Sequence, residues 1–271
     1  MSSYELRMKK LLPPTSIPER PEFCGFELDE PWLVPGYRRN LPHLRLEGAT
    51  YFVTFRLADS IPESVARQWE EERHEWLRAH RVDPSWMDTQ PERWRDAYFA
   101  IPPGERRAFE REEQRRFLVE LDRCHGSCLL EKVHGTVATA LEFFHGQRVW
   151  TGDYVVMPNH VHVLAQPFPG VKLEDWLYSI KRFTSTETGK DASLNTEAVM
   201  RQGHLWQTES FDRIVRGVEE LARTRRYIMN NPSKLRPGTF ALKQMDWLDE
   251  FSPRDSSSTF QCRDERPHAD E

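Results

Sequence analysis

The chain has 271 residues, 38% of them hydrophobic and 30% charged, so at about 150 residues per domain it is long enough for one or two domains with a real core. Its 38 Lys and Arg against 43 Asp and Glu give a net charge of -5, which excludes a uniformly basic protein but leaves room for a locally basic groove. With no apolar run of about 18 residues and four scattered cysteines, we expect a soluble cytoplasmic protein without transmembrane segments or a disulfide scaffold.

The first half of the chain changes composition twice. Residues 1–36 are rich in proline and predict an extended N-terminal arm. Residues 49–57 are β-branched and aromatic and predict a strand. From 62 to 123 the chain is dense in Glu, Arg and Trp, with apolar residues at helical spacing over 63–80 and 104–123. We interpret this part as a helical insertion whose charges cover solvated helix faces.

The second half alternates predicted helices and strands. In chain order the pattern predicts a helix over 136–147, a strand over 149–157, a turn at Pro158-Asn159, a strand over 160–165, a helix over 173–186, a loop over 187–203, an extended piece over 203–207 and a helix over 218–231 that ends before Pro232. The polar residues 251–271 predict a disordered tail. We therefore expect one domain over 37–250 that contains the insertion.

Two histidines stand at the start of the second strand of the predicted hairpin. In Pro158-Asn159-His160-Val161-His162, the alternation of a strand places His160 and His162 on one face and Val161 on the opposite, core-facing side. Two imidazoles on one face, two residues apart, suit a divalent cation. The alternative is that one histidine only hydrogen-bonds a neighbour, and the pair by itself leaves both interpretations open.

The last predicted helix carries a second group of candidates. Tyr227 and Asn231 are four residues apart and share one helix face, although Pro232 is expected to fray the final turn. A carboxamide oxygen is a suitable ligand for Mg²⁺ or Mn²⁺, and a tyrosine beside a metal can attack a polarised phosphate. Its phenol has an ordinary pKa of about 10 and needs activation. The alternative is a core tyrosine with a partner for its hydroxyl.

Four short motifs follow one another along the chain. They are Arg39-Asn40-Leu41-Pro42-His43 with the strand 49–57, the hairpin Pro158-Asn159-His160-Val161-His162, the stretch Leu205-Trp206-Gln207 with 211–216, and Tyr227-Ile228 with Asn231-Pro232. In this order they resemble the REP-associated tyrosine transposases, relatives of the single-tyrosine HUH transposases. The resemblance covers residues 37–57 and 134–237 and leaves out the arm, the insertion and the tail.

The resemblance implies a fold and a reaction. The fold would be α+β, with a ferredoxin-like central antiparallel sheet flanked by helices. His160 and His162 match the metal-binding histidines, Tyr227 matches the nucleophile, and Asn231 matches the polar third ligand. The implied enzyme nicks and rejoins single-stranded DNA at hairpin-forming repetitive extragenic palindromes through a 5′-phosphotyrosine, uses Mg²⁺ or Mn²⁺, and works at the nucleoid. Monomer and homodimer both stay open, because the insertion is large.

Basic residues concentrate beside Tyr227. Between residues 201 and 243 nine Lys and Arg stand against four acidic residues, in a chain whose total charge is negative. This concentration favours contacts with phosphates. The candidate DNA-binding residues are Lys181, Arg182, Arg213, Arg216, Arg225, Arg226 and, as a platform for an unpaired base, Trp206. Ordinary solvated charge is the alternative for each basic residue, and core packing is the alternative for Trp206.

Other groups offer competing interpretations. The segment from Cys124 to Cys128 lacks a second pair at zinc-ligand spacing, so we interpret its cysteines as thiols. Tyr178 is another tyrosine on a helix, but no ligand-type residue follows it one turn later. Besides the nicking and joining enzyme, two functions stay open: a non-catalytic module that binds DNA hairpins on the same fold, and a metal-dependent hydrolase that acts through water. A covalent protein–DNA species distinguishes the first from both.

Overall fold

The computed structural model describes residues 35–38, 42–44, 46–191, 193–194 and 204–251. Most of the predicted arm and all but the first residue of the predicted tail lie outside these described residues. The chain forms two compact units, one from residues 59–128 and the other from the residues before and after that segment. In the described residues, no helix is both long and apolar enough to cross a bilayer.

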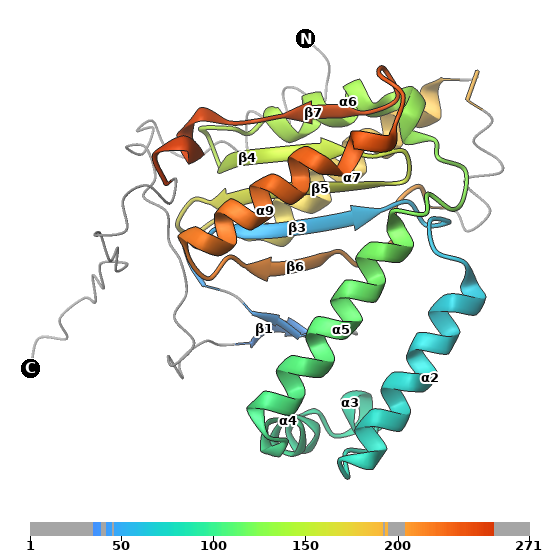
Figure 1. The fold of residues 1–271 in the computed structure, drawn as a ribbon, viewed down its shortest axis with the longest axis vertical. Helices are drawn as coiled ribbons and strands as arrows, with labels where there is room; N and C mark the ends of the chain where they lie inside the picture. Colours follow the sequence, from blue (N-terminus) through green and yellow to red (C-terminus); the bar gives the residue numbers. More distant parts are fainter. Residues whose placement is uncertain (1–34, 39–41, 45, 192, 195–203, 252–271) are drawn as a thin grey trace, which may run out of the picture. The chain divides into compact units, whose positions relative to one another are not determined.

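The larger unit is built on a five-stranded sheet (Figure 1). Its strands are β3 (Tyr51–Arg56), β4 (Val149–Val156), β5 (His160–Pro167), β6 (Phe211–Ile214) and β7 (Ala241–Lys243). They lie in the order β6-β3-β5-β4-β7, and every neighbouring pair is antiparallel. A separate two-stranded ladder joins β1 (Pro35–Arg38) to β2 (Pro42–Leu44).

The first four strands of the sheet have the ferredoxin-like arrangement that was expected. Helix α6 (Leu130–Glu142) connects β3 to β4, and α7 (Leu173–Lys190) connects β5 to β6. Counted in chain order, the strands therefore lie in the spatial order fourth, first, third, second. The fold is thus α+β, and β7 extends the sheet beside β4.

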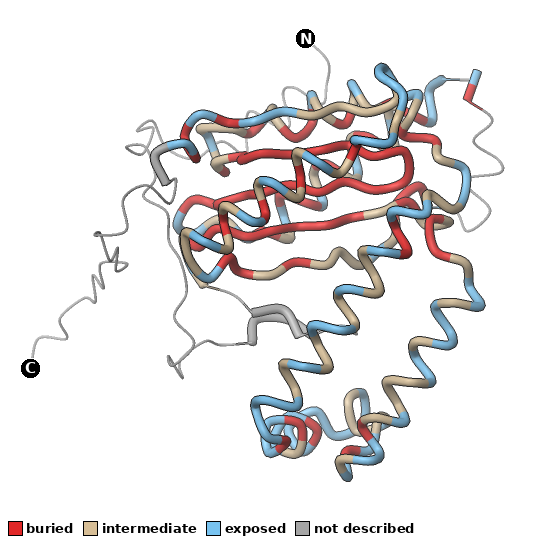
Figure 2. Tube along the Cα trace, in the orientation of Figure 1, coloured by how far each residue is buried: buried red, intermediate tan, exposed pale blue. Residues whose placement is uncertain are grey.

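Both faces of the sheet are covered. On one face α6 and α7 contribute side chains such as Val137, Trp176 and Ile180 to the larger core. On the other face α9 (Val218–Asn230) packs Leu221 and Ile228 against Phe52, Val155 and Leu164, together with residues of η3 (Asp246–Phe251). The central strand β5 is consequently buried along its whole length (Figure 2). The face of β5 that carries the histidines is therefore also packed against other side chains. The sequence predicted a core only on the opposite face, which carries Val161.

Several element boundaries differ from the sequence-based prediction. Helix α6 begins at Leu130 and α7 continues to Lys190, where a loop from residue 187 was predicted. Thr184 and Thr188 are buried on α7, so tertiary packing extends this helix through a polar sequence. Strands β6 and β7 were not predicted, because three or four residues are too few to show an alternation.

The end of α9 is better ordered than the proline after it suggested. Asn231 keeps helical backbone angles, with φ -55° and ψ -45°, and its N–H donates to the carbonyl oxygen of Tyr227. Pro232 then occupies the first turn of a 3-10 helix, η2 (Asn231–Lys234), where the missing N–H has no cost. The prediction of a frayed turn was wrong, and the spacing between Tyr227 and Asn231 is that of a helix.

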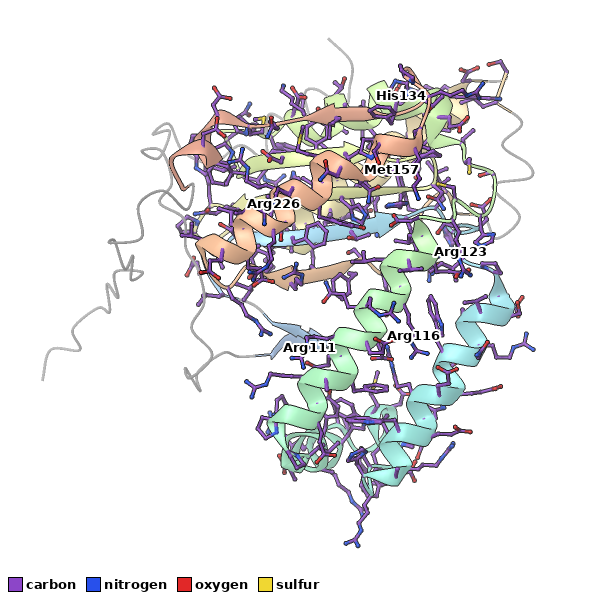
Figure 3. The ribbon with its side chains drawn as sticks, viewed as in Figure 1. Arg111, Arg116, Arg123, His134, Met157 and Arg226 are labelled. Carbon is purple, nitrogen blue, oxygen red and sulfur yellow. The ribbon has the colours of Figure 1, made fainter. Side chains whose placement is uncertain are left out.

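The unit of residues 59–128 is helical. It contains α2 (Glu63–Ala79), α3 (Trp86–Thr89), α4 (Pro91–Ala100) and α5 (Pro103–Leu121), of which the sequence predicted the first and last. A small core of its own gathers Leu77, Val82, Trp94, Tyr98 and Ile101. Ion pairs join the long helices: Arg73 contacts Glu113 at 2.8 Å, and Arg116, labelled in Figure 3, contacts Glu72. The charged composition therefore serves pairing between these helices as well as solvation.

Candidate active site

His160 and His162 lie side by side on the face of β5 that α9 covers. Both side chains are fully buried, and their Nε2 atoms are 3.0 Å apart. Two nitrogen ligands that each lie about 2.1 Å from one ion, with a nitrogen–ion–nitrogen angle of about 90°, would be about 3.0 Å apart. The spacing of the two imidazoles therefore fits ligands of a single cation.

Burial also keeps the two imidazoles neutral. It lowers the pKa of His160 to about 3. For His162 burial, and then the neighbouring His160, hold the pKa well below its ordinary value. A neutral imidazole has one nitrogen with a free lone pair, which is the form that binds a metal ion. At neutral pH both side chains are thus uncharged, which is the state that binding to a metal ion requires.

The other ring nitrogens are held by neighbouring oxygens. Nδ1 of His160 lies 2.7 Å from Oδ1 of Asn159, and Nδ1 of His162 lies 2.7 Å from Oγ1 of Thr54. Thr54 is the direct cross-strand partner of His162 in the β3–β5 ladder. Both oxygens belong to fully buried residues. Each ring is therefore fixed from behind, with its Nε2 directed at the other ring.

Tyr227 reaches this pair from α9. Its Oη lies 3.2 Å from Nε2 of His162, and the two ring centroids are 5.1 Å apart. Phe52 contacts both rings, stacking on His162 at 5.4 Å and meeting Tyr227 edge-on at 6.1 Å. The helix thus directs the phenol oxygen at the same point to which the histidines direct their Nε2 atoms.

Asn231 is placed one helical turn beyond Tyr227. It is half-buried, at the junction of α9 and η2. Its role as a third ligand stays a prediction, which the helical spacing to Tyr227 supports.

A comparison with models of protein families gives one match to this part of the chain. Residues 140–231 match the family described as "Transposase IS200 like". This segment of the chain is therefore similar to the IS200-like transposase family. The family is one of HUH tyrosine nucleases, enzymes that act on DNA hairpins and use a divalent metal ion. The matched segment contains both histidines, Tyr227 and Asn231.

Comparisons with individual proteins are less informative for this chain. One similar solved structure is described as "Structure of the REP associates tyrosine transposase bound to a REP hairpin". The similarity amounts to 14% identity over 74% of each chain, with a TM-score of 0.36. No curated protein matches the chain significantly.

Arg225, a predicted DNA contact, is a structural residue. Its Nε donates to Oδ2 of Asp153 at 2.7 Å, and its Nη2 donates to Oδ1 of Asp249 at 2.7 Å. A third hydrogen bond joins Nη1 to the carbonyl oxygen of Leu248. These bonds use the guanidinium to hold α9 to β4 and η3, so the prediction that Arg225 contacts phosphates was wrong.

Trp206, the predicted stacking platform, also belongs to the interior. It is 5% exposed and lies edge-on to Phe55, with centroids 4.9 Å apart. Its Nε1 donates to Oγ1 of Thr184 at 2.8 Å. Since the ring is enclosed by the larger core, Trp206 is a core residue and the stacking interpretation was wrong.

Lys181 and Arg182 are separated from Tyr227 by the sheet. Both are on α7, which packs on the face opposite to α9. The Lys181 ammonium donates to the carbonyl oxygens of Gln207 and Thr208 at 2.9 and 3.2 Å. Arg182 is exposed. The predicted extension of the basic patch to these two residues therefore does not form on the face that carries the tyrosine.

Three other predicted basic residues lie on the α9 side. Arg213 pairs with Glu220 and places its guanidinium 5.2 Å from the Phe52 ring centroid. Burial, followed by the nearby Arg216 and Arg223, lowers the pKa of Arg213 to about 10, so it stays charged at neutral pH. Arg216 and Arg226 are exposed, and Figure 3 labels Arg226 on α9. Both present their charge to solvent, and Arg226 is the chain neighbour of Tyr227.

The competing candidates are elsewhere. Tyr178 is 63% exposed on α7, on the opposite face of the sheet from the histidines. Cys124 and Cys128 are not joined in a disulfide, and Sγ of Cys128 donates to the carbonyl oxygen of Cys124.

Sequence reasoning missed Phe52 and Thr54. Both are on β3, more than 100 residues before the histidines in the chain. Their even spacing places them on one strand face, but the register that sets them beside His162 is not visible in one sequence.

Proposed function

We propose that this protein is a metal-dependent enzyme that nicks and rejoins single-stranded DNA at hairpin-forming repetitive extragenic palindromes, with Tyr227 as its nucleophile. The observation that carries the proposal is the 3.2 Å distance between Oη of Tyr227 and Nε2 of His162, whose own neighbour is Nε2 of His160. We assign the activity to a domain of residues 37–250 that includes the helical insertion, with the arm and the tail outside it.

The residues divide the chemistry between them. His160 and His162, with the carboxamide oxygen of Asn231, would hold Mg²⁺ or Mn²⁺, which when bound neutralises charge on the scissile phosphate. Tyr227 attacks the phosphorus and forms the bond from its oxygen to the phosphorus, while the bond to the 3′ oxygen breaks. The phenol proton leaves to solvent, and the departing 3′ oxygen takes up a proton. Attack by another 3′-hydroxyl on the phosphotyrosine then joins strands and restores the phenol.

Two observations support DNA as the substrate. The family acts on DNA hairpins, and the exposed Arg216 and Arg226 offer positive charge on the side of the sheet where Tyr227 lies. The choice of repetitive extragenic palindromes rests on the order of the sequence motifs. Such a substrate implies that the enzyme works in the cytoplasm, at the nucleoid.

Covalent capture tests the proposal. Wild-type protein is incubated with a single-stranded hairpin oligonucleotide and Mn²⁺, and a denaturing gel followed by mass spectrometry locates the adduct. We expect a slower-migrating species with DNA on Tyr227, and none with Tyr227→Phe, although that variant still binds the hairpin. Binding without an adduct in the wild type would indicate the non-catalytic module, and cleavage without an adduct would indicate hydrolysis by water.

A further inference from the structure

The geometry points to Thr54 and Asn159 as positioning residues that set the tautomers of the two histidines and so make both Nε2 lone pairs available to one cation. This inference rests on the proposed function, because it concerns the same metal site. It adds two side chains that touch neither the ion nor the DNA.

Asn159 determines the tautomer of His160. A carboxamide oxygen accepts hydrogen bonds and cannot donate them, so Oδ1 of Asn159, at 2.7 Å, requires the proton of neutral His160 to be on Nδ1. Nε2 of His160 then carries the lone pair. The backbone keeps this arrangement rigid, because Leu57 N–H donates to the carbonyl oxygen of Asn159 at 2.9 Å and Leu130 N–H donates to that of Pro158 at 3.0 Å.

Thr54 permits His162 to change its tautomer. Without an ion, the Nε2 lone pair of His160 at 3.0 Å favours a proton on Nε2 of His162, and the Thr54 hydroxyl then donates to Nδ1. When both Nε2 atoms bind a cation, the proton of His162 must be on Nδ1. The Thr54 hydroxyl oxygen then accepts a hydrogen bond from this Nδ1–H group. A hydroxyl serves in both roles, whereas an apolar side chain serves in neither.

The two oxygens therefore act differently on the site. Asn159 keeps the Nε2 lone pair of His160 available in both states of the site. Thr54 forms a hydrogen bond with His162 both before and after the cation binds. Partners behind ligating histidines fix the orientation of the ring and raise its basicity, and their loss typically weakens metal binding by about 10- to 100-fold. Both residues are fully buried, so water does not replace their oxygens.

Metal affinity tests the inference without any DNA cleavage. Mn²⁺ binding to the full chain is measured by electron paramagnetic resonance or calorimetry. We expect Thr54→Val to bind Mn²⁺ about 10- to 100-fold more weakly, and Thr54→Ser to bind it nearly as the wild type does. We expect Asn159→Leu to show a similar loss, and Asn159→Asp, which keeps an acceptor oxygen, to retain binding.

Thr50 provides the matched control. It is as buried as Thr54 and precedes the same strand, but its hydroxyl donates to Oε1 of Gln166 at 2.8 Å. Thr50→Val should leave Mn²⁺ affinity unchanged. An equal loss in Thr50→Val and Thr54→Val would overturn the inference, because it would show a general effect of removing a buried hydroxyl from this part of the chain.

A spectroscopic measurement reports the tautomers directly. In long-range ¹H–¹⁵N spectra of the imidazoles with diamagnetic Mg²⁺, we expect protonated Nδ1 atoms on His160 and His162 in the wild type and in Thr54→Ser. Wild-type affinity in both Thr54→Val and Asn159→Leu would overturn the inference while the proposed function stands. A different result would refute the proposed nucleophile alone. In that case the wild type binds Mn²⁺, Thr54→Val and Asn159→Leu bind it more weakly, and the wild type forms no adduct on Tyr227. A wild type that binds no Mn²⁺ would refute both.

Discussion

Arg225, two residues before Tyr227 on α9, holds the carboxylate of Asp153 with its guanidinium. Asp153 is fully buried and also accepts the backbone N–H of Met245 at 2.9 Å. One ion pair thus joins α9 to β4 and to the segment before η3. The position of the phenol depends on this attachment, because α9 carries it to the histidines.

Removal of one partner of this pair should destabilise the fold strongly. A carboxylate left buried without its partner typically costs about 3–5 kcal/mol, so Arg225→Ala should lower the free energy of unfolding by an amount of that order. Arg226→Ala is the matched control, since the adjacent arginine is exposed and such changes are usually within about 0.5 kcal/mol. Urea denaturation measures both. Equal stabilities of the two variants would contradict the structural role given to Arg225.

Trp206 should affect stability rather than DNA binding. Trp206→Phe removes the hydrogen bond to Thr184 and part of the packing against Phe55, and we expect a loss of about 1–3 kcal/mol in the free energy of unfolding. The folded variant should bind a single-stranded hairpin as tightly as the wild type does, in a fluorescence anisotropy titration. A variant of unchanged stability that binds DNA more weakly would restore the stacking interpretation.

Divalent metal should stabilise the protein through the two histidines. A ligand that binds the folded state alone adds about 2.7 kcal/mol at one hundred times its dissociation constant. Mn²⁺ should therefore raise the Tm of the wild type and of Tyr227→Phe, and a chelator should reverse the shift. In His160→Ala and His162→Ala the shift should be lost. A shift that persists in these two variants would indicate that the ion binds elsewhere.

His145 should make the fold sensitive to acid. Its Nδ1 accepts the backbone N–H of Thr151, and burial, then Lys243, lower its pKa against the opposing effect of Glu142 and Asp246. In the unfolded chain His145 titrates near its ordinary value of about 6.5. The unfolded state therefore binds more protons below that pH, so this contribution to stability is complete above pH of about 6.5 and decreases as the pH falls.

The matched variant is His145→Asn, which keeps an acceptor near the position of Nδ1 but does not titrate. Between pH 7 and pH 5, in steps of about half a unit, its free energy of unfolding should fall less steeply than that of the wild type. Parallel curves for the two proteins would show that His145 does not contribute to the pH dependence.

The sequence predicted the parts of the site that depend on local periodicity. The alternation of β5 correctly placed His160 and His162 on one face, and helical spacing related Tyr227 to Asn231. The strands and helices of the ferredoxin-like unit were also predicted, apart from the short β6 and β7. These features depend on neighbours within a few residues, so a single sequence contains them.

The sequence did not predict the features that depend on distant partners. Arg225 and Trp206 were assigned to DNA because nothing near them in the chain shows that Asp153, 72 residues away, or Thr184, 22 residues away, is their partner. The same reason hid Thr54, which is 108 residues from His162. Residue type and local charge identify groups able to bind phosphate, and only the tertiary structure shows which of them are already engaged.

One nitrogen atom links two events in this protein. Nε2 of His162 is a hydrogen-bond partner of the Tyr227 phenol, and it is also the atom that would offer its electron pair to a cation once its proton has moved to Nδ1. It cannot serve both at once. In the proposed mechanism, an ion bound to this atom would take the place of its contact with the phenol, so that metal binding would also free the oxygen of Tyr227 for the incoming strand.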